Sequence, residues 1–293
     1  MRPSLILIEP PSFHFYNDEF FNANSSLNRD DCLRPNIILR DTLATIGIEV
    51  HTSDCWGDLK GRYDPCSVHY WSLGGPASAA LRFDPAVKKV GCYLMEPPVV
   101  KPRDYALIPQ LSVSFDRVYV HEGVRAAQAR INPSLTNLCH FSWPMTYPDN
   151  LPTQTSGRLN RVAMICGGHT RFRSSDTGNG YALRYRALVD PEIRGHVDLY
   201  GHGWGINKRD MLHPLSILRK LRVRWLHAPQ PVTGKLEVLA RYNFALCAEN
   251  QAIDGYVTEK VVDCLLAGTI PIYWGASDLR DYVPENCFIR VTN

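Results

Sequence analysis

Hydrophobic residues in this chain gather into short runs, and segments of helical periodicity separate those runs. The clearest example lies in the C-terminal third, where an apolar run at 244–248 ends at Glu249. A helix is predicted to begin at Thr258, because threonine is a favourable N-cap residue and apolar residues recur behind it at helical spacing. Gly268 then stands where a helix C-cap is expected, and a second buried strand is predicted at 269–273. This stretch is therefore predicted to fold as strand, loop, helix and strand.

The same alternation extends along the rest of the chain. Short apolar runs predict strands at 5–8, 48–51, 67–71, 90–94, 115–120, 162–165 and 196–200. Helical periodicity predicts helices at 35–46, 77–81, 124–131, 181–189 and 235–242. The first of these helices has an expected apolar face of Ile37, Ile38, Leu43 and Ile46, and a polar loop through Asn28 precedes it. Strands that alternate with helices indicate an α/β fold with doubly wound parallel sheets.

A change of composition divides the chain. The segment 143–161 is rich in Pro, Thr, Ser and Asn and lacks apolar periodicity, as is typical of a connection between domains. A chain of 293 residues also exceeds the usual size of one domain. We therefore expect one domain at 1–150 and a second at 151–293.

Composition and charge exclude several classes of protein. The formal net charge is only +3, which argues against a nucleic-acid-binding protein. The nine cysteines are scattered and form no CxxC motif, which favours a reduced compartment with mostly buried thiols. No stretch approaches the ~20 apolar residues that a membrane span needs, and no secretory signal precedes the first strand. We expect a cytoplasmic protein of bacterial type, and the oligomeric state stays open.

The segment 208–224 carries a run of basic residues around the sequence MLHPLSILRKLRVRW. One interpretation is a surface for an acceptor or for peripheral contact with a membrane. The other is a helix with a solvated basic face, and the sequence favours this second interpretation.

Polar side chains cluster around the predicted loop between the strand at 244–248 and the helix that follows it. They are Glu249, Asn250, Tyr256, Thr258, Glu259 and Lys260. In an open α/β sheet, a loop at a strand's carboxyl end that faces a helix N-terminus is where anionic ligands bind. A carboxylate there can accept from sugar hydroxyls, and Lys260 can hold a phosphate. Any one of these residues could instead be structural, as Glu259 would be if it only complemented the helix dipole.

This stretch also carries a family resemblance. The run FALCAENQAIDGYVTEKVVDCLLAGTIPIYWG resembles the signature of glycosyltransferase family 10, the α-1,3/4-fucosyltransferases. That signature reads F-x-L-x-x-E-N, then Y-x-T-E-K, then L-x-x-G-x-x-P-x-x-x-G, and every fixed position is present here. The resemblance covers residues 244–291 and is far more specific than a single glycine-rich motif.

The resemblance implies a GT-B architecture, in which two Rossmann-like doubly wound domains face each other across a cleft. The N-terminal domain would bind an oligosaccharide or glycoconjugate acceptor, and the C-terminal domain a nucleotide-sugar donor. The implied reaction is inverting transfer of L-fucose from GDP-fucose to a glycan hydroxyl. The chain contains no Asp-x-Asp pair, so we expect no cofactor and no essential metal.

The family's general base is a glutamate between a strand and a proline-containing loop that precedes an F-D motif. Here Glu96 follows the predicted strand at 90–94 and is followed by Pro97-Pro98, and Phe115-Asp116 supplies the F-D pair. Glu96 is therefore the expected catalytic base. Glu122 and His121, after the next predicted strand, are the alternatives.

The family also places a diphosphate-binding arginine on a helix before a V-D-x-x-G strand, which is 197–201 here. By spacing that arginine is Arg184, with Arg186, Arg171 and Arg173 as alternatives. A guanidinium suits the role because its planar fork pairs two oxygens and stays charged.

The implied roles follow from these matches. Arg184, Lys260 and the helix amides near Thr258 would stabilise the leaving diphosphate. The remaining polar residues of the loop would position ribose, fucose or base. Two other functions stay open: the same fold acting on a different nucleotide sugar, and a nucleotide-sugar-binding protein without turnover.

Overall fold

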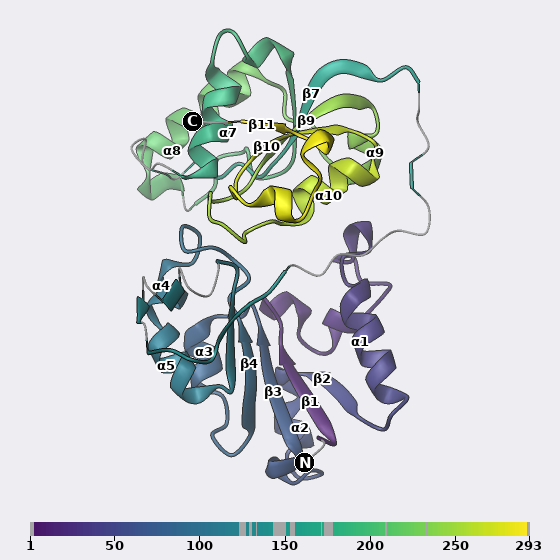
Figure 1. Ribbon diagram of the computed structural model, residues 1–293, viewed down its shortest axis with the longest axis vertical. Helices are drawn as coiled ribbons and strands as arrows, with labels where there is room; N and C mark the ends of the chain where they lie inside the picture. Colours follow the sequence, from purple (N-terminus) through teal and green to yellow (C-terminus); the bar gives the residue numbers. More distant parts are fainter. Residues whose placement is uncertain are drawn as a thin grey trace. The chain divides into compact units, whose positions relative to one another are not determined.

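The computed structural model describes residues 3–122, 127–128, 131–132, 134–142, 151–152, 156–170, 172, 178–208, 210–232 and 234–291. The chain forms two compact units, Met1–Tyr147 and Pro148–Asn293 (Figure 1). No helix within the described ranges is long and apolar enough to cross a membrane.

The first unit is built on a six-stranded sheet in which every pair of neighbours is parallel. Its strands are β1 (Leu5–Glu9), β2 (Glu49–Thr52), β3 (Val68–Leu73), β4 (Lys88–Tyr93), β5 (Arg117–Val120) and β6 (Leu138–His140). Its helices are α1 (Arg34–Ala44), α2 (Trp56–Leu59), α3 (Ala77–Arg82), α4 (Pro102–Ala106) and α5 (Ile108–Ser114). The strand order β2-β1-β3-β4-β5-β6 reverses direction between β1 and β3, as in a doubly wound sheet.

Alternation along the strands divides the core of this unit between the two faces of the sheet. Leu5 and Leu7 of β1 pack into the cluster that holds the residues of α3 and α5. Ile6 and Ile8 belong to the cluster on the other face, which holds Phe20 and residues of α1. Successive side chains of a strand point to opposite faces, so a continuous apolar run is what a strand buried on both faces requires.

Several predictions for this unit are corrected by the structure. The loop after β1 is not merely polar, because it contains a short 3₁₀ turn at Glu19–Phe21 that buries Phe20 and Phe21. Ile38 of α1 lies exposed, as does Ile46, which falls beyond the end of this helix, so only part of the predicted apolar face packs inward. Helices α4 and α5 were not predicted. The predicted helix at 124–131 lies mostly outside the described residues.

The second unit repeats the architecture with a five-stranded parallel sheet in the order β11-β10-β9-β7-β8. Its strands are β7 (Leu159–Ile165), β8 (Val197–Tyr200), β9 (Tyr242–Ala248), β10 (Ile270–Trp274) and β11 (Ile289–Arg290). Its helices are α7 (Gly180–Val189), α8 (Pro214–Leu226), α9 (Lys235–Leu239) and α10 (Glu259–Leu266). Figure 1 shows α7 and α8 on one face of the sheet and α9 and α10 on the other.

Two clusters form the core of this unit, one on each face of the sheet. Met164 of β7 packs with Leu188 of α7 and Val223 of α8. Its neighbour Ala163 packs on the other side, with residues of α9 and α10. The two parallel sheets confirm the predicted α/β class.

All nine cysteines are free thiols. The prediction that most are buried was wrong, because Cys92, Cys247 and Cys264 are buried whereas Cys32 and Cys66 are exposed.

Candidate functional site

The candidate site lies at the carboxyl edge of the second sheet, where the strand order reverses between β7 and β9. Ligands of open α/β sheets bind outside the strand ends at such a switch point. A cavity occupies this position, and its lining includes Arg184, Lys235, Glu259, Lys260 and Asp263. These charged residues come from three different helices, so the fold gathers them around the ends of two strands.

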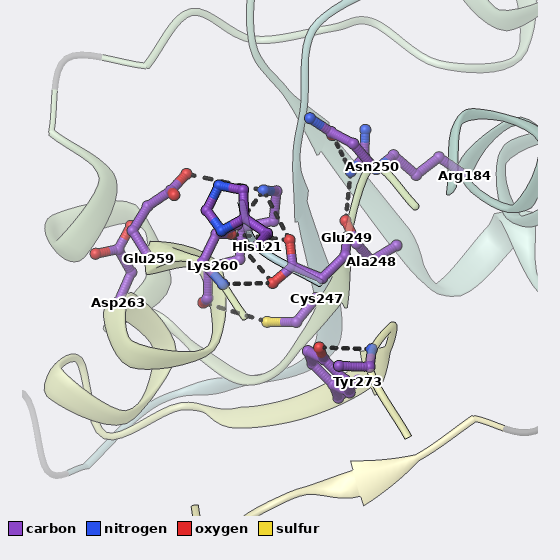
Figure 2. Close-up of polar contacts among 12 residues, drawn as sticks. His121, Arg184, Cys247, Ala248, Glu249, Asn250, Glu259, Lys260, Asp263 and Tyr273 are labelled. Carbon is purple, nitrogen blue, oxygen red and sulfur yellow. Dashed lines mark hydrogen bonds and ion pairs between the residues drawn. The ribbon is translucent and has the colours of Figure 1, made fainter. Parts of the chain in front are cut away.

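Glu249, the first residue after β9, is completely buried. Its Oε1 accepts a hydrogen bond from the backbone N–H of Thr258 at 2.9 Å, and its Oε2 accepts from Lys260 Nζ at 3.1 Å and from Thr258 Oγ1 at 2.8 Å. Figure 2 shows these contacts between the strand end and the start of α10. Both carboxylate oxygens therefore bond within the protein, so Glu249 holds the loop and Lys260 in place.

Thr258 occupies the N-cap position of α10 as predicted, but its side chain makes no capping hydrogen bond. Instead its hydroxyl donates to Glu249 and accepts from Lys260 Nζ at 2.9 Å. The side chain that would ordinarily satisfy an amide of the first helical turn is thus used to bridge Glu249 and Lys260.

Lys260 sits between two carboxylates and is about a quarter exposed. Its Nζ lies 3.1 Å from Glu249 Oε2 and 3.9 Å from Glu259 Oε1. Burial disfavours the charged ammonium, but the carboxylates of Glu259 and Glu249 outweigh this and raise the pKa of Lys260. The side chain is therefore a fixed positive charge at neutral pH.

Glu259 is the more exposed of the two carboxylates. Burial opposes its ionised form, but the ammonium groups of Lys260 and Lys235 lower its pKa to about 2. Because its carboxylate is partly open to solvent and lines the cavity, Glu259 can reach a ligand there.

Arg184 lies on α7 and its side chain is buried. Its Nη2 donates to the carbonyl of Ala248 and, at 3.0 Å, to Oδ1 of Asn250, so the structure brings Arg184 and Asn250 together at the end of β9. The guanidinium carbon also lies 5.1 Å from the ring centre of Tyr181. Within the described ranges, no carboxylate lies at ion-pair distance from Arg184. A buried cation without a carboxylate partner is suited to an anionic ligand.

The other candidate arginines differ in position. Arg186 is exposed on α7. Arg171 and Arg173 lie outside the described residues. Of the four, Arg184 is the one that the structure shows lining the cavity with Lys260.

Tyr256 is buried within the loop between β9 and α10. The loop is tethered on the far side, because the Gly255 N–H donates to Asp278 Oδ1 at 3.0 Å and Ser277 donates to Asp254 Oδ1. Tyr256 thus lies buried in a tethered loop, and its expected contact with a ligand stays a prediction.

Two glycines allow the backbone to close around Glu249. A Cβ at Gly180 would lie 1.7 Å from the Glu249 carbonyl oxygen, and a Cβ at Gly275 would lie 2.7 Å from the Glu249 Cγ. Neither position has room for a side chain. Gly275 belongs to the family signature, whereas the sequence reasoning missed Gly180, whose N–H donates to the Asn250 carbonyl at 3.0 Å.

In the first unit, Glu96 lies in a bend three residues past the end of β4 and is partly exposed. The alternatives Glu122 and His121 follow β5 and are both buried. His121 Nε2 lies 2.7 Å from the Met95 carbonyl oxygen, so this histidine braces the segment that carries Glu96. Among the three, Glu96 is the most accessible to a substrate.

The sequence reasoning missed a second glutamate at this sheet edge. Glu9 ends β1 and, like Glu96, is followed by two prolines, so the repeated Glu-Pro-Pro pattern was the available signal. Glu9 is buried and accepts hydrogen bonds from Tyr16 Oη, at 2.7 Å, and from Ser53 Oγ. Because both its oxygens are engaged, its role here is to join the end of β1 to the loop after β1 and to the turn after β2.

One group in the described part of the chain has the composition of a metal site: Asp18, His51 and Cys55. Their ligand atoms lie within 4.8 Å of one another. His51 Nδ1 lies 2.7 Å from Asp18 Oδ2, and Asp18 Oδ1 accepts from the Thr52 N–H at 2.8 Å. These bonds fasten the loop after β1 to the end of β2, in the first unit and not in the candidate site.

Residues 193–293 match the family described as glycosyltransferase family 10 (fucosyltransferase), C-terminal part. This match confirms the resemblance drawn from the signature.

The α-(1,3)-fucosyltransferase FucT of Helicobacter pylori is 46% identical over 94 residues, covering 27% of this chain and 20% of that enzyme. GDP-fucose protein O-fucosyltransferase 3 of Homo sapiens is 36% identical over 95 residues, covering 32% of this chain and 18% of that protein. This chain thus spans a fifth or less of either curated relative.

Among solved structures, an α1,3-fucosyltransferase matches 99% of this chain and 73% of that chain, with a TM-score of 0.50 and 14% sequence identity. At this identity the likeness concerns the fold. The structural neighbours are GT-B glycosyltransferases, and two parallel-sheet α/β domains are what this chain contains. The predicted fold class is therefore confirmed.

Proposed function

We propose that this chain is an inverting glycosyltransferase that moves L-fucose from GDP-fucose to a hydroxyl group of a glycan. The observation that carries the proposal is the pair of cations at the switch point of the second sheet. Arg184 and Lys260 line one cavity, and both are held there by bonds to the end of β9 and its loop. The family match of residues 193–293 supports a sugar nucleotide as the anion that they bind.

In this proposal the second domain, 151–293, binds the donor and the first, 1–150, binds the acceptor. Arg184 and Lys260 contact the diphosphate, and the amides at the start of α10 add to the positive field. Asn250 holds Arg184, and Glu249 with Thr258 holds Lys260. Glu259, whose carboxylate is partly exposed, accepts from hydroxyls of the ribose or the sugar.

The chemical step forms a bond between the acceptor oxygen and the anomeric carbon while the bond from that carbon to the diphosphate breaks. Glu96 takes the proton that the acceptor hydroxyl loses, a contribution typically worth ~10²–10⁴-fold in rate. Negative charge then grows on the departing GDP, and Arg184 and Lys260 stabilise it. Because two fixed cations serve the diphosphate, we propose that donor binding needs no divalent metal.

Two observations leave alternatives open for the acceptor and for the donor. Because the chain is similar to a protein O-fucosyltransferase, a hydroxyl group of a polypeptide is an alternative acceptor. The cation pair would also hold other nucleoside diphosphate sugars, with or without turnover, because it contacts only the diphosphate.

Calorimetric titration with GDP, GDP-fucose, GDP-mannose and UDP-glucose, in Mg²⁺ and in EDTA, tests the donor. We expect GDP-fucose to bind equally well in both buffers, and strict metal dependence would contradict the proposal. Release of GDP is then measured with glycan and peptide acceptors. If GDP-fucose binds tightly but no GDP is released with any of these acceptors, the chain is a binding protein and not an enzyme.

A further inference from the structure

Helix α8 in the second unit turns polar residues toward the interior and apolar residues toward solvent. Its buried residues include Lys220 and Ser216, each 2% exposed, whereas Leu215, Leu218 and Trp225 are 66%, 62% and 84% exposed. Soluble proteins bury leucine and expose lysine, so a buried lysine beside exposed leucines is the informative exception.

A polar network fixes this orientation. Lys220 Nζ lies 2.7 Å from Asp210 Oδ2 and donates to the Gly205 carbonyl at 3.1 Å. Ser216 Oγ donates to Asp210 Oδ1 at 3.1 Å, and it lies 2.7 Å from Thr170 Oγ1. Rotation of α8 to bury its leucines would break this ion pair, and a buried charge left without its partner is strongly destabilising.

The exposed apolar residues form one continuous stripe. We call it the α8 face, and it consists of Met211, Leu212, Leu215, Leu218, Leu221 and Trp225. Met211 and Leu212 lie in the 3₁₀ turn just before the helix, and the four positions on α8 recur every three or four residues, which places them along one side. Figure 1 shows α8 packed beside α7, on the outside of the sheet.

The exposed charges that lie next to the α8 face along the chain have a single sign. Arg222 and Arg224 lie exposed on the same helix, and Lys208 precedes it. Asp210 is the only acidic residue in the sequence 206–232, and Lys220 neutralises it in the interior. The face therefore combines an apolar stripe, an exposed tryptophan and arginines without exposed acidic residues.

We infer that the α8 face docks on the surface of an anionic lipid bilayer. Leucines and a tryptophan enter the boundary between headgroups and acyl chains, and arginines pair with the lipid phosphates. A second copy of the chain fits the same face less well, because pairing it with itself would bring Arg222 and Arg224 of both copies together. The inference is independent of the proposed sugar transfer, because vesicle binding requires neither donor nor acceptor.

Co-sedimentation of the full chain with two kinds of vesicle tests this inference. One kind is phosphatidylcholine alone, and the other contains phosphatidylglycerol as well. We expect binding to the anionic vesicles only, weakened by high salt. The double variant Arg222→Glu with Arg224→Glu should bind at least about tenfold more weakly, since each arginine near the surface is worth about fivefold. Arg103→Glu, an exposed arginine of α4, is the matched control and should bind as the wild type does.

The apolar contribution is tested with Leu218→Ser and Trp225→Ser, against Val113→Ser, an apolar residue that is 89% exposed in the first unit. The two α8 variants should lose binding while their melting temperatures stay close to that of the wild type, because the substituted side chains contact little. Absence of binding to anionic vesicles would overturn the inference. So would a wild-type dimer in analytical ultracentrifugation that Leu218→Ser converts to a monomer, since that would assign the face to a second copy.

Discussion

Glu249 Oε2 and Lys260 Nζ lie 3.1 Å apart, and the two side chains join the first residue after β9 to the first turn of α10. The carboxylate is completely buried, whereas the ammonium is about a quarter exposed. An ammonium has three N–H donors, and Glu249 and Thr258 accept two of them. The third can serve a ligand oxygen, so the pair combines a fixed position with a remaining donor.

Replacing Glu249 with glutamine should destabilise the protein by at least ~2 kcal/mol. An amide has one acceptor oxygen where the carboxylate has two, so one of the donors from Thr258 or Lys260 would be left unsatisfied in a buried position. Urea unfolding measures the change. Glu259→Gln is the matched control, because that carboxylate is partly solvated and its loss should cost less than that of the completely buried Glu249. Equal effects of the two substitutions would show that Glu249 does not hold the loop.

Arg184→Ala and Lys260→Ala should each weaken the binding of GDP more than that of guanosine. Each removes a charged donor to phosphate, a contact worth roughly 1.5–3 kcal/mol, or about 10- to 150-fold in affinity. Isothermal titration calorimetry with both ligands measures the difference. Arg186→Ala is the control, since Arg186 is exposed on the same helix. If Arg186→Ala lowers GDP affinity and Arg184→Ala does not, the assignment of the diphosphate arginine is wrong.

Acid should weaken the interior network under α8. Hydrogen bonds from Lys220 and from the Asn207 backbone lower the pKa of Asp210 from 3.8 to about 2. A carboxylate whose pKa is depressed on folding stabilises the protein above its unfolded pKa, and this contribution is lost as pH falls through the folded value. The difference in unfolding free energy between wild type and Asp210→Asn should therefore be constant above pH 4 and shrink between about 4 and about 2. A difference that does not change over this range would contradict the depressed pKa.

Local patterns were sufficient to predict most of the fold. The strand, loop, helix and strand at 244–273 appear as β9, α10 and β10, each boundary within two residues of its expected place. These strands are buried on both faces, so their sequences are continuously apolar and easily recognised. The helix predicted at 235–242 was too long, since α9 ends at Leu239 and Tyr242 already pairs with β7. At Tyr242 the tertiary pairing of β9 with β7 therefore overrides the helical periodicity of the local sequence.

What the sequence did not reveal depends on partners distant in the chain. The bonds of Glu249 to Lys260 and of Arg184 to Asn250 form only at the folded sheet edge. The cluster was therefore predicted, but not which of its residues hold others in place and which line the cavity. The basic run at 208–224 was interpreted as a solvated face. Arg222 and Arg224 are exposed on this helix, as that interpretation requires, but it did not include the Lys220–Asp210 ion pair, which buries the lysine and turns the leucines outward. The hydrophobic periodicity of a sequence does not predict which lysine and aspartate form a buried ion pair.

Glu96 determines whether the protein turns over or only binds. Its carboxylate is needed when the acceptor hydroxyl loses its proton, so it should stabilise the transition state and contribute little to donor affinity. Glu96→Gln keeps the shape of the side chain and removes the base. The dissociation constant of GDP-fucose should then stay within a few-fold of the wild-type value, whereas kcat should fall by at least ~10²-fold. Calorimetry gives the first quantity and GDP release in the presence of acceptor gives the second.

The buried Glu122 supplies the comparison for Glu96. If Glu122→Gln reduces kcat while Glu96→Gln remains fully active, the base is Glu122 and the assignment by resemblance is wrong. A Glu96→Gln variant that loses donor affinity in proportion to its rate would make Glu96 a residue that positions the donor. A large fall in kcat with unchanged donor binding is the one combination that a general base predicts, because its interaction with the proton exists only as the acceptor attacks.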